Sequence, residues 1–163
     1  MGHVQRSVVI NAPAEEVFRL MTEASRYGEW VPGWAGLDEG PATVSEGDTL
    51  RWRLYGHRLT FRFRSTITEL DPPRRLREEI RSWIVRATVT KTVVQQKRRT
   101  QLSWTFNYRV PGGPFGVVVD WVIAHRVASR LVERSLSNAK QVLETPKKAT
   151  TAARSHRRQT AVR

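Results

Sequence analysis

One carboxylate in the middle of the chain stands where an apolar residue is expected. Between Leu76 and Ile80, apolar and charged residues alternate. Glu78 occupies one of the alternate positions that are otherwise apolar, which we call the apolar phase of the strand. Alternation with a period of two is typical of a half-buried strand, so Glu78 is expected on the buried face. A buried carboxylate has to be paired or protonated, and it can then orient a ligand hydroxyl or move a proton. A register slip towards solvent, or a salt bridge to a neighbouring arginine, would explain the same pattern.

Other polar side chains are weaker candidates for a role in binding or catalysis. Tyr108 and Ser65 also fall in an apolar phase, and Tyr108 is, with Glu78, the candidate for proton transfer. Both are equally compatible with hydrogen-bonded groups of an ordinary core. His125 and His57 have no partner that the sequence predicts, so catalysis by either is not expected.

The sequence lacks the motifs of cofactor and metal chemistry. It contains no GxSxG elbow, no HExxH, no phosphate-binding glycine loop and no cluster of histidines at metal spacing. Cysteine is absent as well, which excludes disulfides and thiol chemistry and fits a cytoplasmic protein. We therefore predict neither a metal nor another cofactor. The N-terminal residues show no signal-peptide pattern and no run of about 18 apolar residues occurs, so neither export nor a membrane span is expected.

The residues named so far must be positioned by a sheet, because period-two alternation continues for about sixty residues from residue 48. One phase is apolar and aromatic, and the other is basic. The basic phase carries Arg51, Arg53, Arg62, Arg64, Arg75, Arg77 and Arg81. Such a face is most often a solvated surface. Because the aromatic residues alternate inward instead of standing beside the arginines, a nucleic-acid platform is not favoured.

Helices precede and follow this sheet. A first strand over 4–10 leads into a helix over 13–22, a short helical turn over 25–30 and a strand near 37–44. A Pro-Gly-rich break at residues 111–114 is followed by a long helix over 116–143. Its apolar stripe contains Trp121, Ala124, Ala128, Leu131, Ala139 and Val142. We expect this helix to pack lengthwise on the sheet, and the small Ala124 and Ala128 to keep it from filling the space beneath.

The net charge of +13 is unevenly distributed along the chain. Residues 146–163 hold six basic and no acidic residues, which leaves 22 basic and 15 acidic residues in 1–145. The sequence predicts one ligand-binding domain over 1–145 and a flexible basic tail over 146–163. Anionic lipid or nucleic acid is a candidate partner for the tail.

The order of a strand, a helix pair, a six-strand meander and a long terminal helix resembles the START-like (SRPBCC) superfamily. The local sequences that carry the resemblance are VINAPAEEVF at 9–18, YGEW at 27–30, LSWTF at 102–106 and PGG at 111–113. Within the superfamily the chain is most similar to the polyketide cyclase/dehydrase and lipid-transport group, over about residues 3–144. The resemblance implies an α+β helix-grip fold. A curved antiparallel sheet of six to seven strands would wrap around the long C-terminal helix, with two short helices after the first strand.

A helix-grip fold further implies an internal cavity lined by the inward phases of the strands. The expected lining consists of Trp52, Phe61, Phe63, Leu76, Glu78, Ile80, Trp104, Phe106, Tyr108, Trp121 and Ala128. A solid core is the alternative for any single one of these side chains.

Three functions follow from this pattern. The leading hypothesis is the sequestration or transport of a hydrophobic, aromatic or lipid-like small molecule in the cavity. The alternative is a polyketide cyclase/dehydratase, in which Glu78 or Tyr108 moves a proton. A polar pair facing each other across the mouth would favour the enzyme, and a uniformly apolar pocket would favour the carrier. A second alternative is a basic interaction module that docks on anionic lipid or nucleic acid.

Overall fold

The computed structural model describes residues 1–56, 58–109 and 117–145, and for 117–123 it describes the course of the helix alone. Short helices separate the first two strands, and one long helix ends the fold. The elements are β1 (Gly2–Ile10), α1 (Ala14–Thr22), the 3-10 turn η1 (Ala24–Arg26), α2 (Tyr27–Trp30), β2 (Trp34–Glu39), β3 (Thr49–Gly56), β4 (Leu59–Asp71), β5 (Arg75–Arg81), β6 (Arg86–Gln96), β7 (Arg99–Arg109) and α3 (Val117–Glu144).

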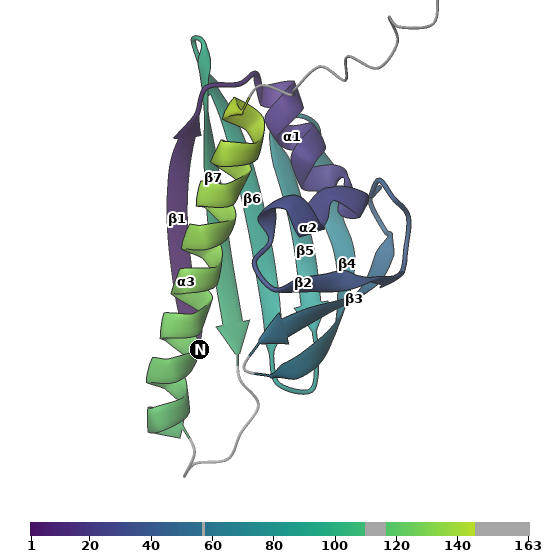
Figure 1. Cartoon of the computed structure of the whole chain (residues 1–163), viewed down its shortest axis with the longest axis vertical. Coiled ribbons are helices and arrows are strands. Elements are labelled where there is room, and N and C mark those ends of the chain that lie inside the picture. The colour runs from purple at the N-terminus through teal and green to yellow at the C-terminus, as the bar shows by residue number, and fades with distance from the viewer. Residues whose placement is uncertain (57, 110–116, 146–163) are drawn as a thin grey trace, which may run out of the picture.

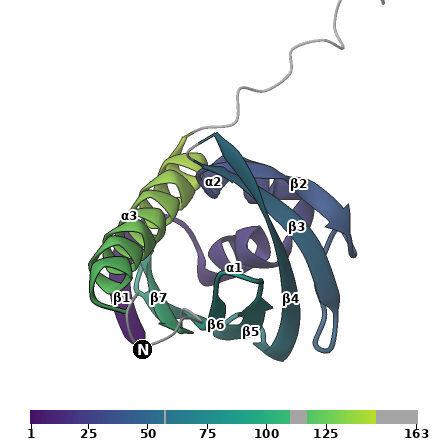
Figure 2. The ribbon, with the colours of Figure 1, turned by 90° about the horizontal axis from the view of Figure 1, so that it is seen from below.

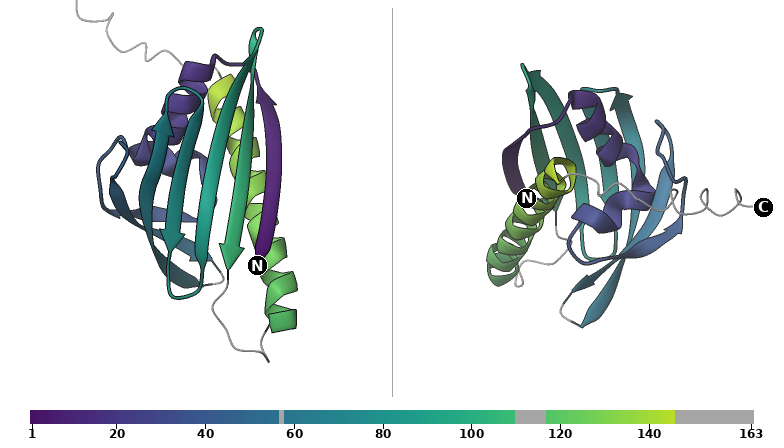
Figure 3. Two further views of the ribbon diagram at one scale, coloured as in Figure 1. Left: turned by 180° about the vertical axis from the view of Figure 1, so that it is seen from behind. Right: turned by 45° about the horizontal axis from the view of Figure 1, so that its top comes forward.

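The strands form one antiparallel sheet of seven strands in the order β1-β7-β6-β5-β4-β3-β2. The sheet curves strongly, and all helices lie on its concave side (Figures 1 and 2). The long helix α3 runs along β1 and β7, α1 packs against β6 and β7, and α2 packs against α3 and β2. The convex side carries no helix, as the view from behind shows (Figure 3). The predicted α+β helix-grip fold is confirmed.

The predicted apolar phase of the strands is the buried phase. Leu50, Leu76 and Leu102 are completely buried, and Ile67 is 1% exposed. A β-bulge after Ile67 shifts the β4–β5 register by one residue. Burying such side chains contributes about 2 kcal/mol each to stability.

The strand expected near 37–44 lies instead at Trp34–Glu39, which corrects the prediction. Gly40 has a φ of +135°, a backbone conformation that L side chains rarely adopt, and the strand ends before it. The start is earlier because the Trp34 ring stacks on Trp52, at a centroid distance of 5.4 Å. The sequence pattern missed this because the β2–β3 register shifts twice within six residues.

The apolar stripe of α3 also differs in part from the prediction. Ala128, Val132, Leu136 and Ala139 are buried, while Leu131 is only half-buried. Spacings of four, four and three residues place the four buried side chains on one face of the helix. The stripe predicted from the sequence contains Leu131 and lacks Val132 and Leu136.

The C-terminal end of α3 is attached to the junction between β1 and α1. Lys140 Nζ donates a hydrogen bond of 2.6 Å to the carbonyl of Val9, and the backbone N–H of Asn11 donates one of 2.7 Å to Glu144 Oε1. Lys140 and Glu144 also pair with each other at 2.7 Å. These bonds fix one end of the helix over the sheet. Among the helices that the structure describes, none is long and apolar enough to cross a membrane.

Candidate functional site

Glu78 points into the interior and forms an ion pair there with Lys91. The distance between Lys91 Nζ and Glu78 Oε1 is 2.9 Å, and the two side chains are 3% and 7% exposed, respectively. The β5–β6 register contains no bulge, so the expected alternative of a slip towards solvent is wrong. The expected arginine partner is wrong too, because both paired residues occupy the inward phases of neighbouring strands. The pair satisfies the rule that a buried charge needs a partner.

Three aromatic rings surround the ammonium group of Lys91. Its Nζ lies 4.9 Å from the ring centroid of Trp104, 5.4 Å from that of Trp30 and 5.5 Å from that of Tyr27. These distances are typical of cation–π contacts. The Tyr27 hydroxyl donates a hydrogen bond of 2.9 Å to the carbonyl of Met21. Burial raises the pKa of the Tyr27 phenol well above its ordinary value, and the negative charge of Glu78 raises it further. Tyr27 therefore stays neutral next to the ion pair.

The rings at Lys91 belong to a continuous aromatic array through the interior. Neighbouring ring centroids lie 4.5 to 5.6 Å apart, in stacked and edge-to-face arrangements. Such pairs contribute about 1 kcal/mol each beyond their buried area. The array consists, in order, of Phe63, Trp52, Trp34, Tyr27, Trp30 and Trp104.

Hydrogen-bond donors within this aromatic array are satisfied at one end and not at the other. Trp52 Nε1 donates a bond of 2.7 Å to the hydroxyl of the buried Ser65. In contrast, the described part of the chain offers no partner to the buried Nε1 atoms of Trp30 and Trp104, nor to Ser129 Oγ on α3. A buried donor without an acceptor costs about 1–3 kcal/mol. An oxygen atom of a molecule bound beside them would satisfy these donors.

A second polar pair links the sheet to α3. The distance between Tyr108 Oη and His125 Nδ1 is 3.4 Å, which is long for a hydrogen bond. Burial raises the pKa of the Tyr108 phenol. Gly2 lies opposite Tyr108 on β1, and a Cβ there would overlap the Tyr108 ring. The glycine thus allows the ring to lie against β1. The sequence predicts no partner for His125, and the structure places Tyr108 beside it.

The predicted lining residues all fall on the inward phases, insofar as the structure describes their side chains. Leu76, Glu78, Ile80, Trp104, Tyr108 and Ala128 are buried. Trp52, Phe61, Phe63 and Phe106 are half-buried. The side chain of Trp121 and the whole of His57 lie outside the described residues. Whether these residues line a ligand stays a prediction.

Several residues of this arrangement were missed from the sequence. Lys91 follows Ala87 and Val89 in period two, so its inward position can be read from the pattern, but lysine is rarely buried and a buried one was not predicted here. Tyr27, Trp30 and Trp34 lie in short, irregular segments, where no periodicity indicates which side chain is buried.

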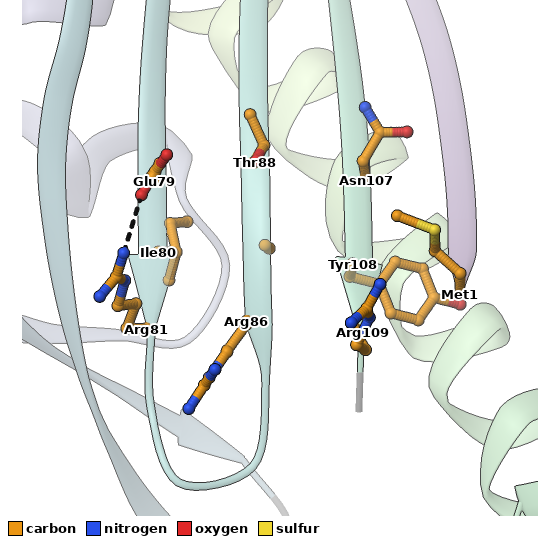
Figure 4. A pocket seen from close by; sticks show the side chains of 10 residues that line it. Met1, Glu79, Ile80, Arg81, Arg86, Thr88, Asn107, Tyr108 and Arg109 are labelled. Carbon is orange, nitrogen blue, oxygen red and sulfur yellow. Dashed lines mark hydrogen bonds and ion pairs between the residues drawn. The ribbon is translucent and has the colours of Figure 1, made fainter. Parts of the chain in front are cut away.

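Hollows that the structure shows at the surface lie away from the aromatic array. One depression of about 320 Å³ lies at the β5, β6 and β7 ends of the sheet, between Arg81 and Arg109, and two of the predicted lining residues, Ile80 and Tyr108, border it (Figure 4). Another of about 420 Å³ lies beside the start of α1, between Glu15 and Val93. Among the described residues, no group of three or more acidic or histidine side chains is placed to hold a metal ion.

The curved sheet closed by α3, with an aromatic interior and a few buried polar groups, defines a START-like helix-grip protein. The family model described as polyketide cyclase/dehydrase and lipid transport matches residues 1–144, and the chain belongs to this family.

Solved structures share the same fold at low sequence identity. A protein of Thermus thermophilus matches with a TM-score of 0.72 and 19% identity, over 87% of this chain and 97% of the other. The Zhui aromatase/cyclase of Streptomyces sp. R1128 matches with a TM-score of 0.69 and 21% identity, over 88% and 93%. The di-domain aromatase/cyclase BexL of the BE-7585A biosynthetic pathway has a TM-score of 0.68 and 19% identity, over 86% of this chain and 46% of BexL. These identities support the fold alone. No curated protein matches the sequence.

Proposed function

We propose that the protein binds a hydrophobic, ring-containing or lipid-like small molecule between the sheet and α3. The observation that carries this proposal is the pair of buried indole N–H groups of Trp30 and Trp104, for which the described residues provide no acceptor. Aromatic faces beside them provide stacking surface, and the unpaired donors select a ligand with a carbonyl or hydroxyl oxygen. The family supports a small-molecule role of this kind. A cytoplasmic location, expected from the absence of cysteine, stays a prediction.

Indole NMR tests this proposal directly. The protein is labelled with ¹⁵N-tryptophan, the indole signals are assigned by Trp→Phe variants, and 2-acetonaphthone, a two-ring aromatic ketone, is titrated in. We expect the indole signals of Trp30 and Trp104 to move, because their N–H groups gain an acceptor. The signal of Trp83, which is 79% exposed, should stay in place. Trp104→Phe should weaken binding about fivefold, the equivalent of one lost hydrogen bond. Signals of Trp30 and Trp104 that stay unchanged at saturating ketone would contradict the proposal.

A second candidate function rests on the contact between Tyr108 and His125. A histidine and a neutral tyrosine 3.4 Å apart can act as a general base and a general acid. In a polyketide cyclase/dehydratase, the imidazole would take a proton from the carbon between two carbonyl groups. That carbon would attack another carbonyl of the same chain, which forms the ring bond and leaves a hydroxyl on the attacked carbon. The phenol would protonate the hydroxyl that leaves as water. Glu78, the other candidate, is held in an ion pair with Lys91 and serves this role less well.

Steady-state kinetics distinguish the two candidates. With a synthetic poly-β-ketone thioester, Tyr108→Phe and His125→Ala should each lower kcat about 10²-fold or more while KM stays nearly constant. His3→Ala, at an exposed histidine on β1, is the matched control and should keep full activity. Binding of the thioester without its conversion would contradict the enzyme function, and the carrier would remain as the single candidate.

A further inference from the structure

Exposed arginines form a single line across the convex face of the sheet. In the strand registers, each arginine of this line lies directly opposite the next one on the neighbouring strand. The line, which we call the arginine row, consists of Arg51, Arg64, Arg81, Arg86 and Arg109. With strands about 4.8 Å apart, the row is roughly 19 Å long.

The charge of the arginine row is only partly compensated by the protein. Like charges directly opposite each other on neighbouring strands are destabilising. Arg51 pairs with Glu39 at 3.0 Å and Arg81 with Glu79 at 3.2 Å. Within the described residues, the other three members of the row have no acidic partner. A surface that keeps unpaired arginines side by side is suited to anions from outside.

Exposed apolar side chains lie next to the row, at one end of the molecule. Arg81, Arg86 and Arg109 are the terminal residues of their strands at the end where the β3–β4 and β5–β6 hairpins turn (Figure 1). Large apolar side chains occupy those hairpins. They are Tyr55, Leu59 and Trp83, which are 57%, 59% and 79% exposed.

The β5–β6 turn holds Trp83 in its exposed position. The Ser82 hydroxyl lies 3.3 Å from the backbone nitrogen of Ile84 and 3.1 Å from that of Val85, and both nitrogens donate to it. The backbone N–H of Ser82 also donates to the carbonyl of Val85 at 2.9 Å. The indole is therefore presented to solvent by an ordered turn.

We propose that this end of the sheet docks on an anionic lipid surface. Tryptophan and tyrosine favour the interface between headgroups and acyl chains, which is where the hairpin tips would lie. The arginine row would then stand at the level of the phosphate groups, where guanidinium groups bind with two hydrogen bonds each. The arginine row lies on the convex side of the sheet, and none of the six rings of the aromatic array borders the depression between Arg81 and Arg109.

The arrangement of the guanidinium groups favours an extended surface over a single bound anion. In the close view of the depression, those of Arg81, Arg86 and Arg109 are spread over three strands and do not meet at one point (Figure 4). Single-stranded nucleic acid is less favoured, because its bases would need aromatic rings between the arginines. Here Tyr55 and Trp83 lie on the hairpins instead.

Vesicle co-sedimentation of the full chain tests the proposal. The wild type should bind phosphatidylcholine vesicles that contain phosphatidylserine, and binding should weaken as salt is added. Each arginine near an anionic leaflet contributes about a fivefold factor, so the triple variant R81Q/R86Q/R109Q should bind about a hundredfold more weakly. The control is the triple variant R74Q/R77Q/R98Q, which removes the same charge from exposed arginines outside the row and should bind nearly as the wild type does.

Two further comparisons make the outcome decisive. A chain without residues 146–163 should keep the difference between the two triple variants, although its overall affinity is lower because six basic residues are gone.

Lipids brominated on the acyl chain should quench the tryptophan fluorescence of the wild type more than that of the Trp83→Phe variant. Equal losses in both triple variants would overturn the proposal, and so would binding to a single-stranded oligonucleotide in preference to the vesicles.

Discussion

Replacing Lys91 by methionine removes the positive charge from the interior and keeps the length of the side chain. Glu78 would then be a carboxylate that is 7% exposed and has lost its partner at 2.9 Å. Breaking a buried ion pair on one side costs about 3–5 kcal/mol, and the loss of the cation–π contacts adds to this. Since small domains are stable by only about 5–15 kcal/mol, Lys91→Met should remove a large share of the free energy of unfolding. Urea unfolding followed by far-UV circular dichroism measures the loss.

The neighbouring exposed pair on the same strand provides the matched control. Glu79 and Arg81 lie 3.2 Å apart with side chains 46% and 71% exposed, so Glu79→Gln should cost no more than about 0.5 kcal/mol. The double variant Glu78→Leu/Lys91→Met removes both buried charges together. Its loss of unfolding free energy should be several kcal/mol smaller than the sum of the losses in the single variants Glu78→Leu and Lys91→Met. Single losses below about 1 kcal/mol that simply add in the double variant would refute the reasoning.

Two further variants probe the surroundings of the site. Ser65→Ala leaves Trp52 Nε1 without its acceptor and should lower the free energy of unfolding by about 1–2 kcal/mol, measured in the same assay; an unchanged midpoint would argue against this hydrogen bond. Glu144→Gln tests the attachment of α3. Hydrogen bonds from Lys140 and the Asn11 backbone lower the pKa of Glu144 below its ordinary value of 4.5, so the folded state favours the charged form. Its contribution, about 1 kcal/mol, is present above pH 4.5 and disappears as the pH falls through the lowered pKa. The difference between wild type and variant should therefore be constant from pH 7 to about 5 and vanish in stronger acid; a difference that persists there would contradict this assignment.

Much of the fold is readable from the sequence, because alternation of period two marks which side chains each strand buries. Glu78 and Tyr108 were recognised as buried polar groups for that reason. Lys91 was not, although it stands in the same kind of phase, because a lysine was not expected on a buried face. The pairing of Glu78 with Lys91 depends on the β5–β6 register, which the composition of the two strands does not determine.

The arginine row could not be predicted for a related reason. The sequence places arginines on the outer phase, but their alignment depends on the hairpin lengths and on the bulge after Ile67. A shift of one residue in any hairpin would break the row. The exposure of Trp83 likewise results from the turn held by Ser82, which the composition of the hairpin does not determine.

The most direct test of ligand binding in the interior is native mass spectrometry of the protein purified from its own host. Three proteins are compared: the wild type, Ala128→Trp and Val127→Trp. Ala128 is 7% exposed and faces the sheet, so an indole there should fill the ligand space, whereas Val127 is 51% exposed and its variant adds the same bulk on the solvent side. We predict that the wild type and Val127→Trp carry a small apolar molecule and that the folded Ala128→Trp does not. The same molecule retained by Ala128→Trp, or no bound molecule in any of the three proteins, would contradict binding between the sheet and α3.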